Sequence, residues 1–70
     1  MNSMAINGYK AVISFDPELG LFRGEFTGLA GGADFYAEDA PGLQREGEAS
    51  LRMYLAACAE RSIEPLAKQA

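Results

Sequence analysis

Hydrophobic and polar residues alternate along two stretches in the first half of the chain. From Tyr9 to Phe15 every second residue falls on an apolar face, and the alternation resumes from Phe22 to Phe26. A period of two is typical of half-buried β-strands. Between the two stretches, Asp16–Gly20 combines Asp, Pro and Gly, the residues that favour a tight turn. The pattern therefore predicts a β-hairpin over residues 8–27.

A third short strand is predicted over residues 33–38, where Phe35 and Ala37 alternate with polar residues. It follows a glycine-rich break at residues 28–32. A phosphate-binding loop would lead into a helix, often with a lysine, whereas this break leads into a strand. We therefore interpret the break as a turn between strands.

The second half of the chain has the period of an amphipathic helix. Apolar and small residues recur at steps of three and four from Leu43 to Ala59. Asp39 is suited to cap the first turn, and Pro41 falls where its missing N–H has no cost. These signals predict one helix over about residues 40–61.

Together the elements predict a single α+β domain over residues 8–65. Its three-stranded antiparallel sheet has the helix packed on one face, and Gly47 allows the helix a close approach to the sheet. Residues 1–7 and 66–70 are expected to be flexible tails. The apolar face of so few strands needs such a cover, because isolated hairpins are marginal in water.

Composition limits what such a domain does. The 70 residues include one cysteine and no histidine, so neither an intrachain disulfide nor a zinc site reinforces the core. Domains of this size commonly rely on oligomerisation instead, and we expect a homo-oligomer. The net charge of −4 argues against binding to nucleic acid or to an anionic membrane. No membrane span or signal pattern is present, and the lone cysteine fits a reducing compartment, so a cytoplasmic location is expected.

No set of residues forms a recognisable catalytic or metal site, and no cofactor is expected. Asp16 with Glu18, or Glu38 with Asp39, is a conceivable acid–base pair, but turn and cap positions explain these carboxylates better. Cys58 lies on the apolar stripe of the helix and is interpreted as a small buried residue. We therefore expect the chain to act by binding a protein and not as an enzyme.

Three runs resemble HicB-type antitoxins of bacterial type II toxin–antitoxin systems. The run Phe15–Leu29 is similar to that family's first hairpin, and Phe35–Asp39 to its third strand and helix cap. The run Tyr54–Pro65 resembles its helix end, a Tyr-Leu…Cys-Ala-Glu-Arg-Gly-Ile-Glu-Pro pattern. The helix-end match is the more specific, and the resemblance covers about Gly8 to Pro65.

The resemblance implies a degenerate ribonuclease-H-like fold without hydrolase activity. It also implies neutralisation of a small RNA-cleaving toxin, HicA, by covering its active site, and assembly into dimers or tetramers. An acidic chain suits a basic, RNA-binding partner. Many members continue into a DNA-binding domain, whereas this chain stops at Ala70, so no C-terminal DNA-binding domain and no direct DNA binding are expected. Ala40-Pro41-Gly42 also departs from the acidic helix start usual in the family.

The residues expected to contact the partner combine negative charge with two larger side chains. Acidic residues would attract a basic toxin, while an aromatic and an aliphatic residue would anchor it; the alternative is that all of them simply solvate the sheet. The acidic candidates are Glu25, Asp34, Glu38 and Asp39, and the anchors are Tyr36 and Leu21. Two other functions stay open: an orphan HicB-like homo-oligomer, with or without a small ligand between subunits, and an RNA-binding domain, which the charge and the missing histidine disfavour.

Overall fold

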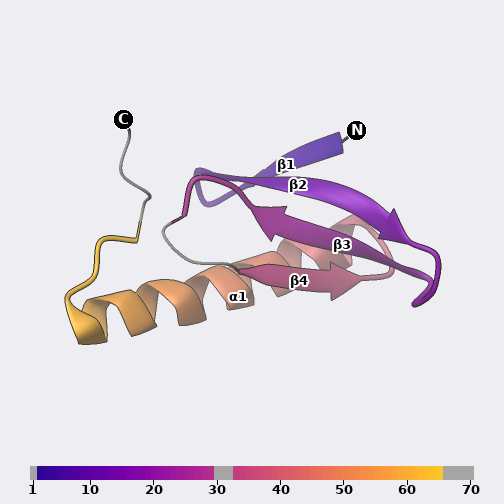
Figure 1. Ribbon diagram of the computed structural model, residues 1–70. Helices are drawn as coiled ribbons and strands as arrows, with labels where there is room; N and C mark the ends of the chain where they lie inside the picture. The colour runs from indigo at the N-terminus through magenta and orange to yellow at the C-terminus, as the bar shows by residue number, and fades with distance from the viewer. Residues whose placement is uncertain (1, 30–32, 66–70) are drawn as a thin grey trace.

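The protein is an α+β structure with one antiparallel four-stranded sheet and one helix (Figure 1). The computed structural model describes residues 2–29 and 33–65, so the tail predicted at residues 66–70 lies outside the described residues. The strands follow one another across the sheet in chain order, β1-β2-β3-β4. The elements are β1 (Asn2–Ile6), β2 (Tyr9–Asp16), β3 (Leu21–Phe26), β4 (Asp34–Ala37) and α1 (Ala40–Arg61).

The first strand was not expected. The sequence predicts a flexible tail over residues 1–7 and a sheet of three strands; the strand count is wrong, and so is the tail over residues 2–6, whereas residue 1 lies outside the described residues. Residues Asn2–Ile6 pair antiparallel with β2, and Ile6 is fully buried. Asn7 and Gly8, with φ of 51° and 86°, form the connecting turn. Asn-Gly favours two-residue turns with positive φ, so this pair closes a hairpin between β1 and β2.

The second hairpin forms as predicted. Strands β2 and β3 pair along their length, from Ala11 opposite Phe26 to Asp16 opposite Leu21. The carboxylate of Asp16 accepts hydrogen bonds from the backbone N–H of Glu18 and of Leu19, at 3.0 and 3.3 Å. Asp16 thus has the turn-forming role that its position suggests.

Helix α1 confirms the predicted bounds. The Oδ1 atom of Asp39 accepts a hydrogen bond from the backbone N–H of Gly42 at 2.7 Å, which caps the helix. At the other end Ser62 has the left-handed conformation, with φ of 56°, and its N–H bonds to the carbonyl of Ala59. A helix of 22 residues is about 33 Å long, whereas the four residues of β4 span about 13 Å. The helix therefore runs along β4 and extends past it (Figure 1).

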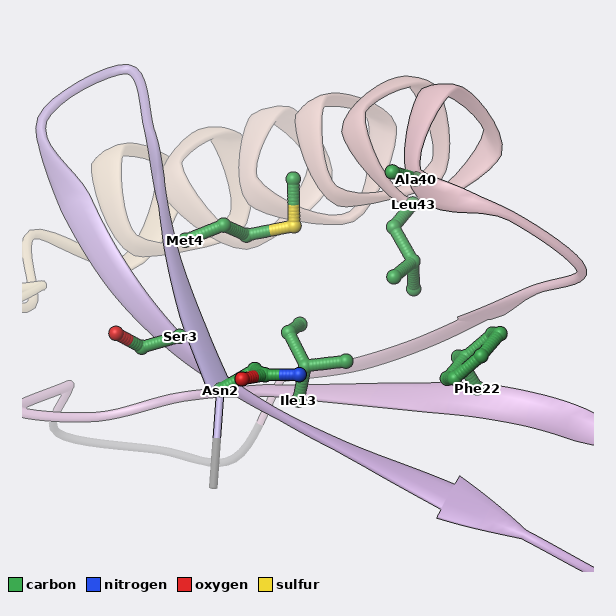
Figure 2. A pocket seen from close by; sticks show the side chains of 7 residues that line it. All are labelled: Asn2, Ser3, Met4, Ile13, Phe22, Ala40 and Leu43. Atoms are coloured by element: carbon green, nitrogen blue, oxygen red, sulfur yellow. The ribbon is translucent and has the colours of Figure 1, made fainter.

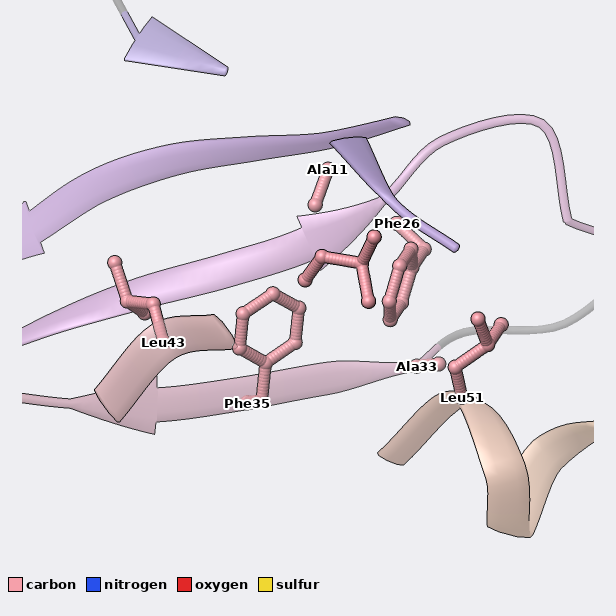
Figure 3. Packing of buried hydrophobic residues seen from close by; sticks show 7 residues of the cluster. Ala11, Phe26, Ala33, Phe35, Leu43 and Leu51 are labelled. Carbon is pink, nitrogen blue, oxygen red and sulfur yellow. The ribbon is translucent and has the colours of Figure 1, made fainter. Parts of the chain in front are cut away.

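The core lies between α1 and the sheet (Figure 3). Phe35 packs beside Phe26, with ring centroids 5.2 Å apart. A Cβ atom at Gly24 would overlap the ring of Phe35, and one at Gly47 would overlap Ile6. The predicted close approach at Gly47 is thus confirmed, and its partner is a residue of the unpredicted strand. The buried cluster comprises Ile6, Ala11, Phe26, Ala33, Phe35, Leu43 and Leu51.

Candidate functional site

Four of the predicted contact residues lie together on the sheet face turned away from α1, here called the outer face. Leu21 and Glu25 are on β3, and Asp34 and Tyr36 are on the neighbouring strand β4. Glu25 is directly opposite Asp34, and Arg23 is opposite Tyr36. Strand pairing thus brings together residues that are up to 15 positions apart in the chain.

Arg23 lies at the centre of this group and was not among the predicted residues. Its Nη2 atom donates to Oδ2 of Asp34 at 2.5 Å, and its Nη1 atom lies 3.5 Å from Oε1 of Glu25. The hydrogen bond and charge of Asp34, and more weakly the charge of Glu25, raise the pKa of Arg23 above its ordinary value. One guanidinium faces two carboxylates, so the group as a whole keeps a net negative charge.

Glu38 and Asp39 follow β4, and both are exposed. They extend the negative charge from the outer face toward the start of α1. The Asp39 carboxylate also holds the helix cap described above, so it has a structural role whether or not a partner contacts it. From the sequence alone, the alternation of residues along β4 is enough to place Asp34 on the outer face. Its pairing with Arg23 is not predictable in this way, because it depends on the register between β3 and β4.

A second surface lies on the helix side of the sheet and was missed from the sequence. The sequence predicts that α1 covers the apolar face, but this is wrong at the end that contains Phe15 and Phe22. These rings contact each other edge to face and are 54% and 36% exposed. The helix follows β4, and this leaves the far end of the β2–β3 hairpin without a cover.

An open groove of about 290 Å³ lies beside this uncovered region; we call it the apolar groove (Figure 2). The side chains of Met4, Ile13 and Leu43 converge on it from β1, β2 and α1 (Figure 2). Together with Phe22 of β3, four elements therefore build it, and the sequence did not predict one of them, β1. Its lining residues are Asn2, Ser3, Met4, Ile13, Phe22, Ala40 and Leu43.

Neither surface has the residues of a metal centre. Within residues 2–29 and 33–65, no group of three or more His, Cys, Asp or Glu side chains is placed to hold a metal ion. Cys58 is buried on α1, as predicted. In the same part of the chain, α1 is too polar to cross a membrane.

The described residues thus form two chemically different surfaces, one acidic and one apolar. Searches against protein-family models, curated proteins and solved structures find no match to this chain.

Proposed function

We propose that this chain is a protein-binding module that neutralises a small, basic, RNA-cleaving toxin of the HicA type by covering its active site. The observation that carries the proposal is the acidic group on the outer face. Glu25 and Asp34 form ion pairs with Arg23, and Glu38 is exposed just past the other end of β4. Because the carboxylates are already positioned, a basic partner would meet them with little loss of side-chain freedom.

Tyr36 and Leu21 provide larger side chains within the same surface. Tyr36 is 38% exposed, and Leu21 is half-buried at the start of β3. Tyrosine is common among the residues that dominate binding energy, because it contributes a large apolar area and a polar hydroxyl. The surface thus combines charge, which favours encounter with a basic protein, with an apolar anchor, which favours retention.

The sequence resemblance to HicB-type antitoxins supports the proposal independently of the charge. It extends from about Gly8 to Pro65 and so includes the strands that carry the acidic group. We accordingly propose that the sheet and helix correspond to a degenerate ribonuclease-H-like fold, and that the chain functions in the cytoplasm without hydrolase activity and without binding DNA directly.

A second candidate function is that of an orphan relative that only assembles with itself. The apolar groove and the exposed rings of Phe15 and Phe22 favour it, because monomers rarely leave such a surface open to water. The two functions differ in one expectation. A toxin-binding module forms a mixed complex, whereas an orphan homo-oligomer does not.

The test is co-expression with a HicA-type toxin, or with any short basic protein that a neighbouring gene encodes, followed by affinity purification and measurement of the dissociation constant. Wild type should form a stable mixed complex and rescue growth. Asp34→Lys combined with Glu38→Lys should weaken the complex by about tenfold or more, because attraction becomes repulsion. Glu60→Lys with Glu64→Lys, which makes the same change in net charge on exposed residues at the end of α1, serves as the control.

Equal affinity in the two double variants, with both folded by circular dichroism, would exclude the outer face as the binding surface. Failure of the wild-type chain to bind the basic protein or to rescue growth would remove the toxin-neutralising function itself. The orphan candidate would then be the better supported function.

A further inference from the structure

The two edge strands of the sheet differ in how well they are protected from another strand. Strand β4 is only four residues long, has Asp34 at one end and exposed Glu38 just past the other, and lies against α1. The hydroxyl of Ser50 on the helix donates to the backbone carbonyl of Asp34 at 3.3 Å. Short length, charge and a helical cover are the features that stop edge strands from pairing.

Strand β1 is less protected, although it is only one residue longer than β4 and contacts α1 through Ile6. Its sequence, Asn-Ser-Met-Ala-Ile, contains no charged residue and no proline. Among residues 2–29 and 33–65, it pairs with β2 on one side and with no strand on the other. Residues Asn2, Ser3 and Ala5 are exposed. The backbone groups on its outer side are therefore open to a further strand.

We propose that a second copy of this chain pairs with β1 through its own β1, in antiparallel orientation, and so joins two sheets into one. The charge distribution selects a second copy as the occupant. Two chains of net charge −4 repel each other over most of their surfaces. The residues of β1 and of the apolar groove include no ionisable side chain, so like chains meet there with the least repulsion.

A basic partner has the opposite preference. It gains nothing from the uncharged edge and is attracted to the carboxylates that β3 and β4 present on the outer face, at the other side of the sheet. The self-association surface and the toxin-binding surface of the proposed function are therefore separate. The proposed self-association does not depend on the proposed toxin binding, nor toxin binding on self-association.

The apolar groove gives the pairing a source of free energy beyond backbone hydrogen bonds. Asn2, Ser3 and Met4 line the groove and also form the unpaired edge (Figure 2). A strand added at β1 therefore borders the groove and covers part of its apolar lining. A domain of this size has a small core of its own, and burial of this kind is a common way to stabilise it.

The first test measures the mass of the protein alone by light scattering and its dissociation constant by sedimentation. Wild type should be a dimer or a multiple of one. Ser3→Glu should weaken dimerisation by about tenfold or more, since the two-fold axis brings each new charge into the interface twice. Ser14→Glu is the matched control: it lies on the same face of the interior strand β2, opposite Arg23, and should leave the dimer intact. A monomeric wild type, or a dimer equally stable in both variants, would overturn the proposal.

A crosslinking test detects the pairing of two β1 strands directly and does not rely on weakening the dimer. In an antiparallel pair of identical strands, the two-fold axis is normal to the sheet. One residue of each strand then lies directly opposite the same residue of the other chain. With Cys58→Ala as background, the single variants Ser3→Cys, Met4→Cys and Ala5→Cys are oxidised in turn. One of the three should form an intermolecular disulfide, because directly opposed positions lie within disulfide range. Ser14→Cys should not. Absence of a crosslink in all three folded variants would contradict pairing through β1.

Discussion

The two outer strands of the sheet, β1 and β4, are held in place by different means. Strand β4 is covered by α1, which begins two residues after it with the cap at Asp39. Strand β1 is held by its pairing with β2 across the turn at Asn7-Gly8 and by one fully buried side chain, Ile6, which packs against the helix at Gly47. The paired carboxylates Glu25 and Asp34 lie on β3 and β4, whereas β1 has no charged residue. A sheet of four strands thus offers two chemically distinct surfaces, each suited to a different kind of partner.

The largest expected effect is a loss of stability when the attachment of β1 to the core is weakened. Ile6→Ala removes the buried side chain that joins this strand to Gly47 and the core, and should lower the free energy of unfolding by about 2–5 kcal/mol. Denaturant unfolding at a fixed protein concentration measures it, since self-association contributes to stability. Ile63→Ala, at a position 47% exposed, is the control and should change little. Equal losses in the two variants would show that β1 is not anchored as described.

A smaller loss of stability is expected from a substitution at the β4 side of the sheet. Asp39→Ala removes the helix cap and should cost about 0.5–2 kcal/mol in the free energy of unfolding. Glu38→Ala removes an exposed carboxylate from the adjacent position and should leave stability nearly unchanged. Thermal unfolding of the two variants separates the cap from a general effect of charge. A cap that contributed nothing would give the same melting temperature in both.

The smallest expected effect is on the rate at which a basic partner associates with the outer face. Arg23→Met leaves Asp34 and Glu25 without their cation and makes the net charge one unit more negative than −4. Association with the basic partner should become a few-fold faster at low salt, and the gain should fall as salt screens it. Stopped-flow association rates at two ionic strengths measure this. A slower association in the variant would show that Arg23 itself contacts the partner.

The sequence was sufficient for elements whose signals are local. The helix bounds followed from Asp39, Pro41 and the apolar period, and the β2–β3 turn followed from Asp16 and Gly20. Strand β1 was missed because Asn2–Ile6 has only two large apolar residues, and its stability comes from pairing with β2 and burial of Ile6. The apolar groove was missed for a related reason. Which part of the sheet a helix covers depends on the direction in which it packs, and the period of its residues does not specify that direction.

For the outer face, alternation predicted which residues share a surface, and strand register then brought Glu25 next to Asp34. The position of Arg23 between them could not be predicted, because residues 11 positions apart meet only once β3 and β4 are paired. The same alternation placed Phe15 and Phe22 on the core side correctly. The sequence did not predict that these two rings are exposed to solvent.

One measurement compares the two surfaces directly: the mass and composition, by light scattering, of complexes that each variant forms with the co-expressed basic protein. Ser3→Glu should lose self-association and still bind that protein. Asp34→Lys with Glu38→Lys should keep self-association and lose the basic protein. If Ser3→Glu instead loses the basic protein, or if the charge-reversed variant retains it at wild-type affinity, the division between an uncharged β1 side and an acidic outer face is wrong.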